Sequence, residues 1–124
     1  MIIAELDSIV CYSVMEGFEK YVPENGECFS IEIQVDVGIK GQEGAEIFSF
    51  NVCTAKWLEE NYKDEIVFLR HIILVPYFNY EMLKNRIEKL IKSIHAETWN
   101  EYAEKLSRYG YWEFEDYQDI SCNV

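Results

Sequence analysis

The sequence predicts an α+β fold in which helices pack on one face of an antiparallel sheet. Three observations lead to this class. Apolar and polar residues alternate with period two in the first half, apolar residues recur at helical spacing in the second half, and the predicted elements follow the order βββαβαα. Strands that succeed one another before most of the helices favour antiparallel pairing. The 124 residues are expected to form one domain, 1–124, because this length suits a single hydrophobic core.

Three strands are expected in the first half of the chain. Residues 29–37 alternate most regularly, with apolar residues at the odd positions and, between them, Ser30, Glu32, Gln34 and Asp36. A less regular alternation sets Glu5 and Asp7 against an apolar side made of Ala4, Leu6, Val10 and Tyr12. Residues 48–52 alternate in the same way, and the three glycines of residues 38–46 suit a hairpin turn before them.

A short helix and a central strand are expected next. Thr54 is a suitable N-cap for a helix that carries Trp57 and Leu58, because its hydroxyl can accept a hydrogen bond from a free backbone amide. Residues 66–75 are almost continuously apolar, which is typical of a strand in the middle of a sheet. Pro76 ends this run, since proline lacks the amide that a sheet ladder needs.

Two further helices are predicted, and both are expected to pack on the sheet. Asn79 can cap the first, whose apolar stripe consists of Leu83, Ile87, Leu90, Ile91 and Ile94. The second begins with a capping box, Thr-Trp-Asn-Glu, in which Thr98 and Glu101 satisfy free backbone amides reciprocally. This second helix is expected to stop at Gly110.

The segment GYWEFEDY, residues 110–117, alternates aromatic and acidic residues close to the end of the chain. In an extended segment Trp112 and Phe114 would point inward and the carboxylates outward. The aromatic residues are then mainly structural and the carboxylates are available to a partner. A second interpretation makes Trp112 itself an interface anchor, because tryptophan and tyrosine are enriched at binding hot spots.

The net charge of −12, from 23 acidic and 11 basic residues, restricts the possible partners. Contact with a nucleic-acid backbone or an anionic membrane would be repulsive, so neither partner is expected. The longest purely aliphatic run has four residues, whereas a membrane-spanning helix needs about 20. A basic protein partner is favoured, although the charge alone equally fits a role in keeping a small protein soluble.

Four cysteines are present, without a CxxC pair and without a neighbouring histidine at metal-ligand spacing. Because no signal peptide is recognisable at the N-terminus, we expect reduced thiols in a cytoplasmic protein. The even count also permits disulfide pairing.

The sequence shows no arrangement typical of an enzyme, a metal site or a cofactor site, so none of the three is expected. Cys53 and His71 could form a nucleophile and base, but no local signature supports that pair. Glu32 and Asp36 lie about 13 Å apart if they share a strand, which is too far for a shared metal or a glycosidase pair.

Several irregular motifs recur in order and together resemble the Immunity protein 8 family of small bacterial proteins assigned to polymorphic toxin systems. They are CTAKWL (53–58), LRHIILV (69–75), the T-W-x-E helix start (98–101) and KLSRYGYWEFEDY (105–117). The resemblance spans roughly residues 38–117. It implies an α+β immunity protein whose partner is a toxin domain, commonly encoded alongside, with no enzyme activity and no cofactor.

Two acidic surfaces are candidates for binding such a toxin. The first comprises the residues after the last predicted helix, Tyr111, Glu113, Glu115, Asp116, Tyr117 and Asp119. The alternative is the open side of the sheet, where Ser49 and Asn51 would accompany Glu5, Asp7, Glu32, Gln34 and Asp36. An uncharacterised small enzyme and an acidic cytosolic adaptor without a toxin partner remain as other hypotheses, and the oligomeric state is open.

Overall fold

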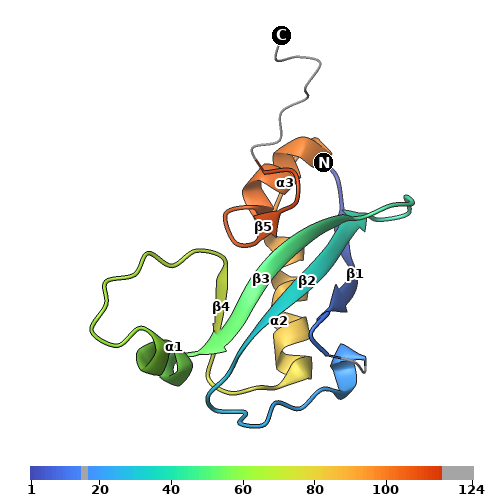
Figure 1. The fold of residues 1–124 in the computed structure, drawn as a ribbon. Helices are drawn as coiled ribbons and strands as arrows, with labels where there is room; N and C mark the ends of the chain where they lie inside the picture. Colours follow the sequence, from blue (N-terminus) through green and yellow to red (C-terminus); the bar gives the residue numbers. More distant parts are fainter. Residues whose placement is uncertain (15–16, 116–124) are drawn as a thin grey trace.

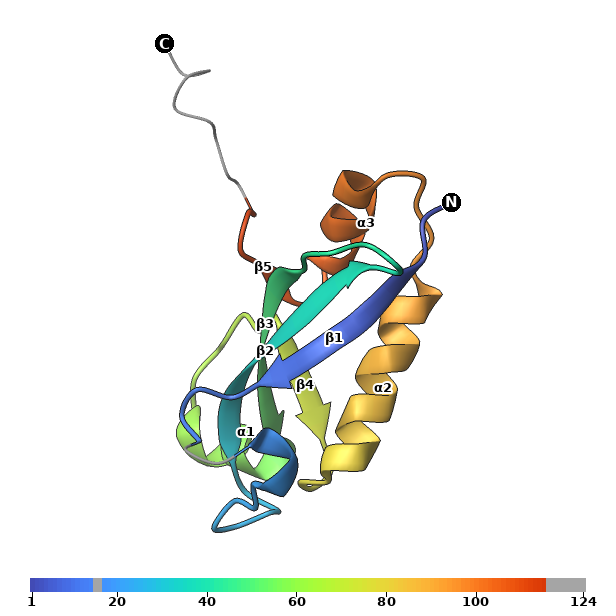
Figure 2. The same ribbon diagram turned by 90° about the vertical axis from the view of Figure 1, so that its right-hand side faces the viewer.

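A computed structural model describes residues 1–14 and 17–115 of the chain. Within these ranges one five-stranded sheet has the order β1-β2-β3-β4, and a short strand, β5 (Tyr111–Trp112), pairs with β3 beside β4 (Figure 1). Helices α2 and α3 pack on one face of this sheet, and α1 lies at the end of β3 (Figure 2). The α+β class expected from the sequence is confirmed, and the sheet, expected to be antiparallel, is mostly so, with one parallel pair, β3–β4.

The β2–β3 hairpin forms the centre of the sheet. Strands β2 (Ser30–Ile39) and β3 (Glu46–Thr54) pair antiparallel, with Ile33 opposite Phe50 and Val35 opposite Phe48. These four side chains are buried against the helices, as the period-two alternation predicts. The glycine-rich turn is also confirmed, because Gly41 and Gly44 adopt φ values of +82° and +93° that other residues rarely accept.

Strand β1 (Ala4–Val10) corrects the expected alternation. A bulge lies between Leu6 and Ser8, so the side chains after it exchange faces relative to a regular strand. Ile9 packs against the core instead of Val10, and Tyr12 is exposed. The apolar side expected to include Val10 and Tyr12 is therefore wrong beyond the bulge.

The central strand expected over residues 66–75 is also wrong. Strand β4 covers only Ile72–Val75 and pairs, in parallel, with β3 alone, so it lies at an edge. Residues 65–70 form no strand, and Ile66 and Phe68 are each 97% exposed. His71, whose φ is +59°, turns the chain into β4. A run of apolar residues therefore lies on the surface here.

Helix α2 (Tyr80–Ser93) carries the predicted apolar stripe. Asn79 caps it, its side-chain oxygen accepting from the Met82 amide at 3.0 Å. Leu83, Ile87 and Ile91 are buried, while the remaining members of the stripe, Leu90 and Ile94, are partly buried against the core. The stripe and its cap are confirmed.

Helix α3 (Trp99–Leu106) is held against α2 by Tyr102. This fully buried phenol donates a 2.6 Å hydrogen bond to the Ile91 carbonyl in the last turn of α2, and burial raises its pKa. Thr98 caps α3 through the Glu101 amide, as expected. The Glu101 carboxylate, however, accepts from the amide of Glu97 instead of that of Thr98, and this bond together with Lys105 lowers its pKa.

The remaining helix, α1 (Ala55–Asn61), begins at its predicted cap. Thr54 accepts from the Trp57 amide at 3.3 Å. No residue of α1 is buried, so this helix adds little to the core. Among the described residues, no helix is long and apolar enough to cross a membrane.

Candidate functional site

The face of the sheet opposite α2 and α3 is not covered by a helix over its centre (Figure 2). Directly opposite residues of paired strands point to the same face, so the register assigns its members. We use the name open sheet face for Glu5, Ser8, Val10, Glu32, Gln34, Asp36, Ile47, Ser49, Asn51 and Tyr111. All of them are exposed or half-buried, and the set contains three carboxylates and no lysine or arginine.

One row across the open sheet face joins the two predicted binding surfaces. Val10 lies opposite Gln34, Gln34 opposite Ser49, and Ser49 opposite Tyr111 of β5 (Tyr111–Trp112). Tyr111 is exposed and stands edge-on to the His71 ring, with ring centroids 5.7 Å apart. The aromatic residue expected at the C-terminal site therefore lies beside the polar residues of the alternative site.

The carboxylates of the open sheet face differ in their contacts. Asp36 accepts a 2.7 Å hydrogen bond from the Ser8 hydroxyl, which fixes its direction. Glu32 is exposed, opposite Asn51. Glu5, which lies opposite Gly38, is on this face as expected, whereas Asp7 lies in the β1 bulge and has no cross-strand partner; both also border a hollow between β1 and α2. The structure thus brings together only part of the predicted acidic set.

The segment after α3 follows the predicted alternation only as far as β5. Trp112 is buried and stacks on Phe48, with ring centroids 6.4 Å apart. The next residues turn, because the Glu115 amide donates to the Trp112 carbonyl, and Phe114 is 40% exposed instead of inward. The structural interpretation of Trp112 is favoured by this burial.

The acidic residues of this segment make internal contacts. Glu113 is exposed, and its carboxylate accepts from the Ile47 amide at 3.1 Å. Glu115 forms an ion pair with both terminal nitrogens of Arg70, and its side chain is only 14% exposed. Three further candidates lie outside the described residues: Asp116, Tyr117 and Asp119.

The described residues offer no support for catalysis. Cys53 is buried, burial raises the pKa of its thiol, and no hydrogen bond joins it to His71 within these residues. His71 instead contacts the Ser107 carbonyl through Nε2 at 3.2 Å. In the described ranges, no group of three or more His, Cys, Asp or Glu residues is placed to hold a metal ion. Cys11, Cys28 and Cys53 are free thiols.

Sequence reasoning missed the position of β5 and the basic residues near it. Nothing local shows that Tyr111 would pair with Ser49, since the two lie 62 positions apart in the chain. The uneven distribution of arginine was a usable signal, because all three arginines, Arg70, Arg86 and Arg108, lie in the second half of the chain.

Comparison with known proteins gives one family. The model of the family described as Immunity protein 8 matches residues 4–117, which is most of the chain. No curated protein and no solved structure matches significantly.

Proposed function

The chain belongs to the Immunity protein 8 family, a family of proteins that neutralise a cognate toxin, and we propose that it binds this toxin through the open sheet face. Immunity proteins of this kind act as inhibitors and not as enzymes. The finer proposal is that the toxin surface is basic, and that Glu32, Asp36 and Tyr111 are the main contacts.

The observation that carries the proposal is the cross-strand row that ends at Tyr111. It sets an exposed aromatic ring on the same face as Glu32 and Asp36, without a basic residue in the set. Tyrosine is enriched at binding hot spots, and a polar rim around such an anchor is usual in protein interfaces. The rigid hairpin beneath these residues limits the entropy lost on binding, because their backbone is already ordered.

Electrostatic attraction gives this surface a kinetic role. Complementary charges steer two proteins together and raise association rates to roughly 10⁸ M⁻¹s⁻¹ or more at low salt. The net charge of −12 would act in the same direction toward a basic toxin. Fast capture favours an inhibitor that must bind before its toxin acts.

The test uses the cognate toxin domain and compares two charge-matched variants. Glu32→Gln with Asp36→Asn removes two charges from the open sheet face and leaves an amide oxygen that can still accept from Ser8. Glu81→Gln with Glu88→Gln removes two charges from α2, on the covered side. The open-face variant should lower the association rate about three- to tenfold at low salt, and the α2 variant should change it little.

Tyr111→Ala tests the anchor separately. Loss of a hot-spot ring should raise the dissociation rate, at a cost of about 2 kcal/mol or more in binding free energy. Unchanged rate constants for the open-face variant and for Tyr111→Ala would contradict the proposal. Equal effects of both charge variants would show that the net charge, and not the open sheet face, sets the association rate. A variant that removes the charges of Glu113, Glu115 and Asp116 examines the C-terminal segment as the competing surface.

A further inference from the structure

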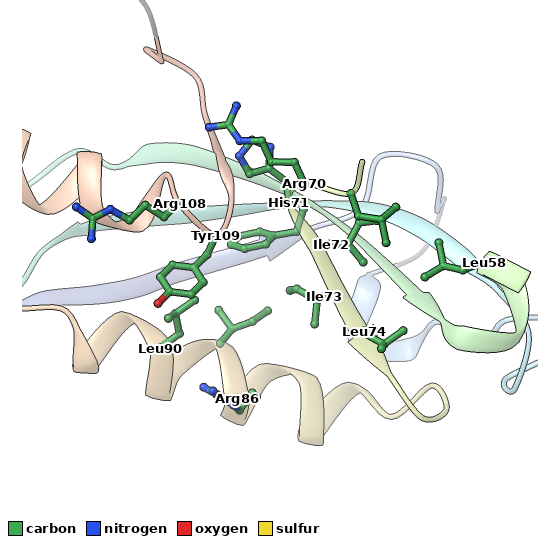
Figure 3. A pocket seen from close by; sticks show the side chains of 13 residues that line it. Leu58, Arg70, His71, Ile72, Ile73, Leu74, Arg86, Leu90, Arg108 and Tyr109 are labelled. Carbon is green, nitrogen blue, oxygen red and sulfur yellow. The ribbon is translucent and has the colours of Figure 1, made fainter. Parts of the chain in front are cut away.

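A hollow of about 570 Å³ lies between β4, α2 and the residues that follow α3 (Figure 3). We call it the β4 groove. Apolar side chains form most of its wall, among them Phe50, Ile73, Ile87 and Leu90. This volume and composition fall within the range of ligand sites in proteins.

The β4 groove runs along the outer edge of β4. Successive residues of a strand point to opposite faces, yet Ile72, Ile73 and Leu74 all line the groove. A cavity can contact all three only from the side of the strand. Among the described residues β4 pairs with β3 alone, so its outer edge offers backbone groups to an added strand.

The groove also gathers positive charge in an acidic protein. All three arginines of the chain line it, and its lining includes no aspartate or glutamate (Figure 3). Arg70 is paired with Glu115, but in the described part of the chain neither Arg86 nor Arg108 forms an ion pair. Glu104, one turn before Arg108, is hydrogen-bonded to Asn100 instead. Two arginines are therefore available to a carboxylate.

Exposed apolar residues continue from the groove onto the surface. Leu69 and Leu74 line the groove and are more than half exposed, and Ile66 and Phe68 precede them in the chain almost fully exposed. Ile72 lies opposite Asn51, so the groove adjoins the open sheet face. Contiguous exposed apolar surface of this kind marks interaction sites.

We propose that the β4 groove binds an extended segment of the cognate toxin, which adds as a strand to the edge of β4. This inference rests on the proposed function, because it names a second contact of the same complex. Backbone hydrogen bonds to β4 would hold the segment, and its apolar side chains would enter the groove. A carboxylate of the segment would pair with Arg86 or with Arg108, since a guanidinium group binds a carboxylate in a planar, two-bond geometry. One or two acidic side chains in an otherwise basic toxin suffice for such pairing.

The decisive experiment measures hydrogen exchange and binding with the same toxin. Adding toxin should slow amide exchange in residues 72–75, because an added strand protects the outward amides of an edge strand. Arg86→Gln with Arg108→Gln should raise the dissociation constant about tenfold or more, mainly through faster dissociation. Lys84→Gln with Lys89→Gln removes two positive charges from α2, the helix that carries Arg86, but outside the groove, and should change the dissociation constant less than twofold.

The outcomes separate this inference from the proposed function. If the wild-type protein binds toxin but the arginine variant binds equally well, or residues 72–75 are not protected, the groove is not a toxin contact and the open sheet face can still be one. If the wild-type protein does not bind the toxin, both proposals fail. Protection of residues 72–75 that rises with protein concentration in the absence of toxin would overturn the inference in favour of a second copy of the chain.

Discussion

Gly110 is a position where a single added methyl group is expected to disturb the core. A Cβ atom added there would lie 2.7 and 2.8 Å from Cε2 and Cε1 of the Phe50 ring and still closer to Cζ. Real Cβ contacts almost never fall below 3.0 Å, so the ring or the backbone has to move. Phe50 is only 3% exposed and is held within the central hairpin, so the ring has little room.

The expected cost of Gly110→Ala follows from two opposing terms. Overpacking a core costs about 1 to 3 kcal/mol, and the loss of glycine freedom in the unfolded chain returns about 0.4 to 1 kcal/mol. We expect a net destabilisation of about 1 to 2 kcal/mol. For a domain of this length, that corresponds to a melting temperature lower by about 4 to 8 °C.

Urea unfolding followed by tryptophan fluorescence measures this effect, with Gly26→Ala as the control. The nearest atom to a Cβ at Gly26 is Cβ of Phe78 at 3.9 Å, an ordinary contact, so this variant should not be less stable than the wild type. Phe50→Leu should lower the free energy of unfolding less in the Gly110→Ala variant than in the wild-type protein, because the smaller side chain relieves the clash. An unchanged unfolding midpoint for Gly110→Ala would refute the packing argument.

Three further changes test other parts of the fold. Tyr102→Phe should destabilise by about 1 to 2 kcal/mol in urea unfolding, because it leaves the buried Ile91 carbonyl without its donor; a neutral result would contradict that bond. Ile87→Ala should cost about 2 to 5 kcal/mol by the same measurement, and an unchanged midpoint would contradict its burial between α2 and the sheet. Glu115→Gln should speed amide exchange in residues 66–70 without lowering global stability by more than 1 kcal/mol, since it removes the partner of Arg70; unchanged exchange would show that the ion pair does not hold this loop.

Most of the fold is predictable because its signals are local. The alternation in β2 and β3, the apolar stripe of α2 and the side-chain caps at Thr54, Asn79 and Thr98 each act within a few residues of chain. Periodicity and capping express that local physics directly. These elements lie where the sequence places them, to within a few residues.

The sequence-based predictions are wrong where one pattern is compatible with two different structures. A continuous apolar run fits a buried strand, but it equally fits a surface that another protein covers, and residues 66–70 are exposed. A bulge near Asp7 needs the register of the neighbouring strand before it becomes visible. Gly110 does not end α3, which stops at Leu106; it lies against Phe50, a residue 60 positions away that local patterns do not reveal. The candidate site depends on such long-range pairings, so its residue types were predictable and its assembly was not.

The two proposed contact surfaces would contribute differently to a complex, because their charges and burial differ. Glu32 and the half-buried Asp36 lie on a polar face, where ion pairs add little to equilibrium stability and act mainly on the association rate. The β4 groove combines apolar walls with Arg86 and Arg108, so a carboxylate bound there would be partly removed from water, and its pairing would act mainly on the dissociation rate. Raising the salt concentration should therefore slow the association of the wild-type protein strongly and change its dissociation less. A dissociation rate that rises with salt as steeply as the association rate falls would mean that both surfaces bind through solvent-exposed charges alone.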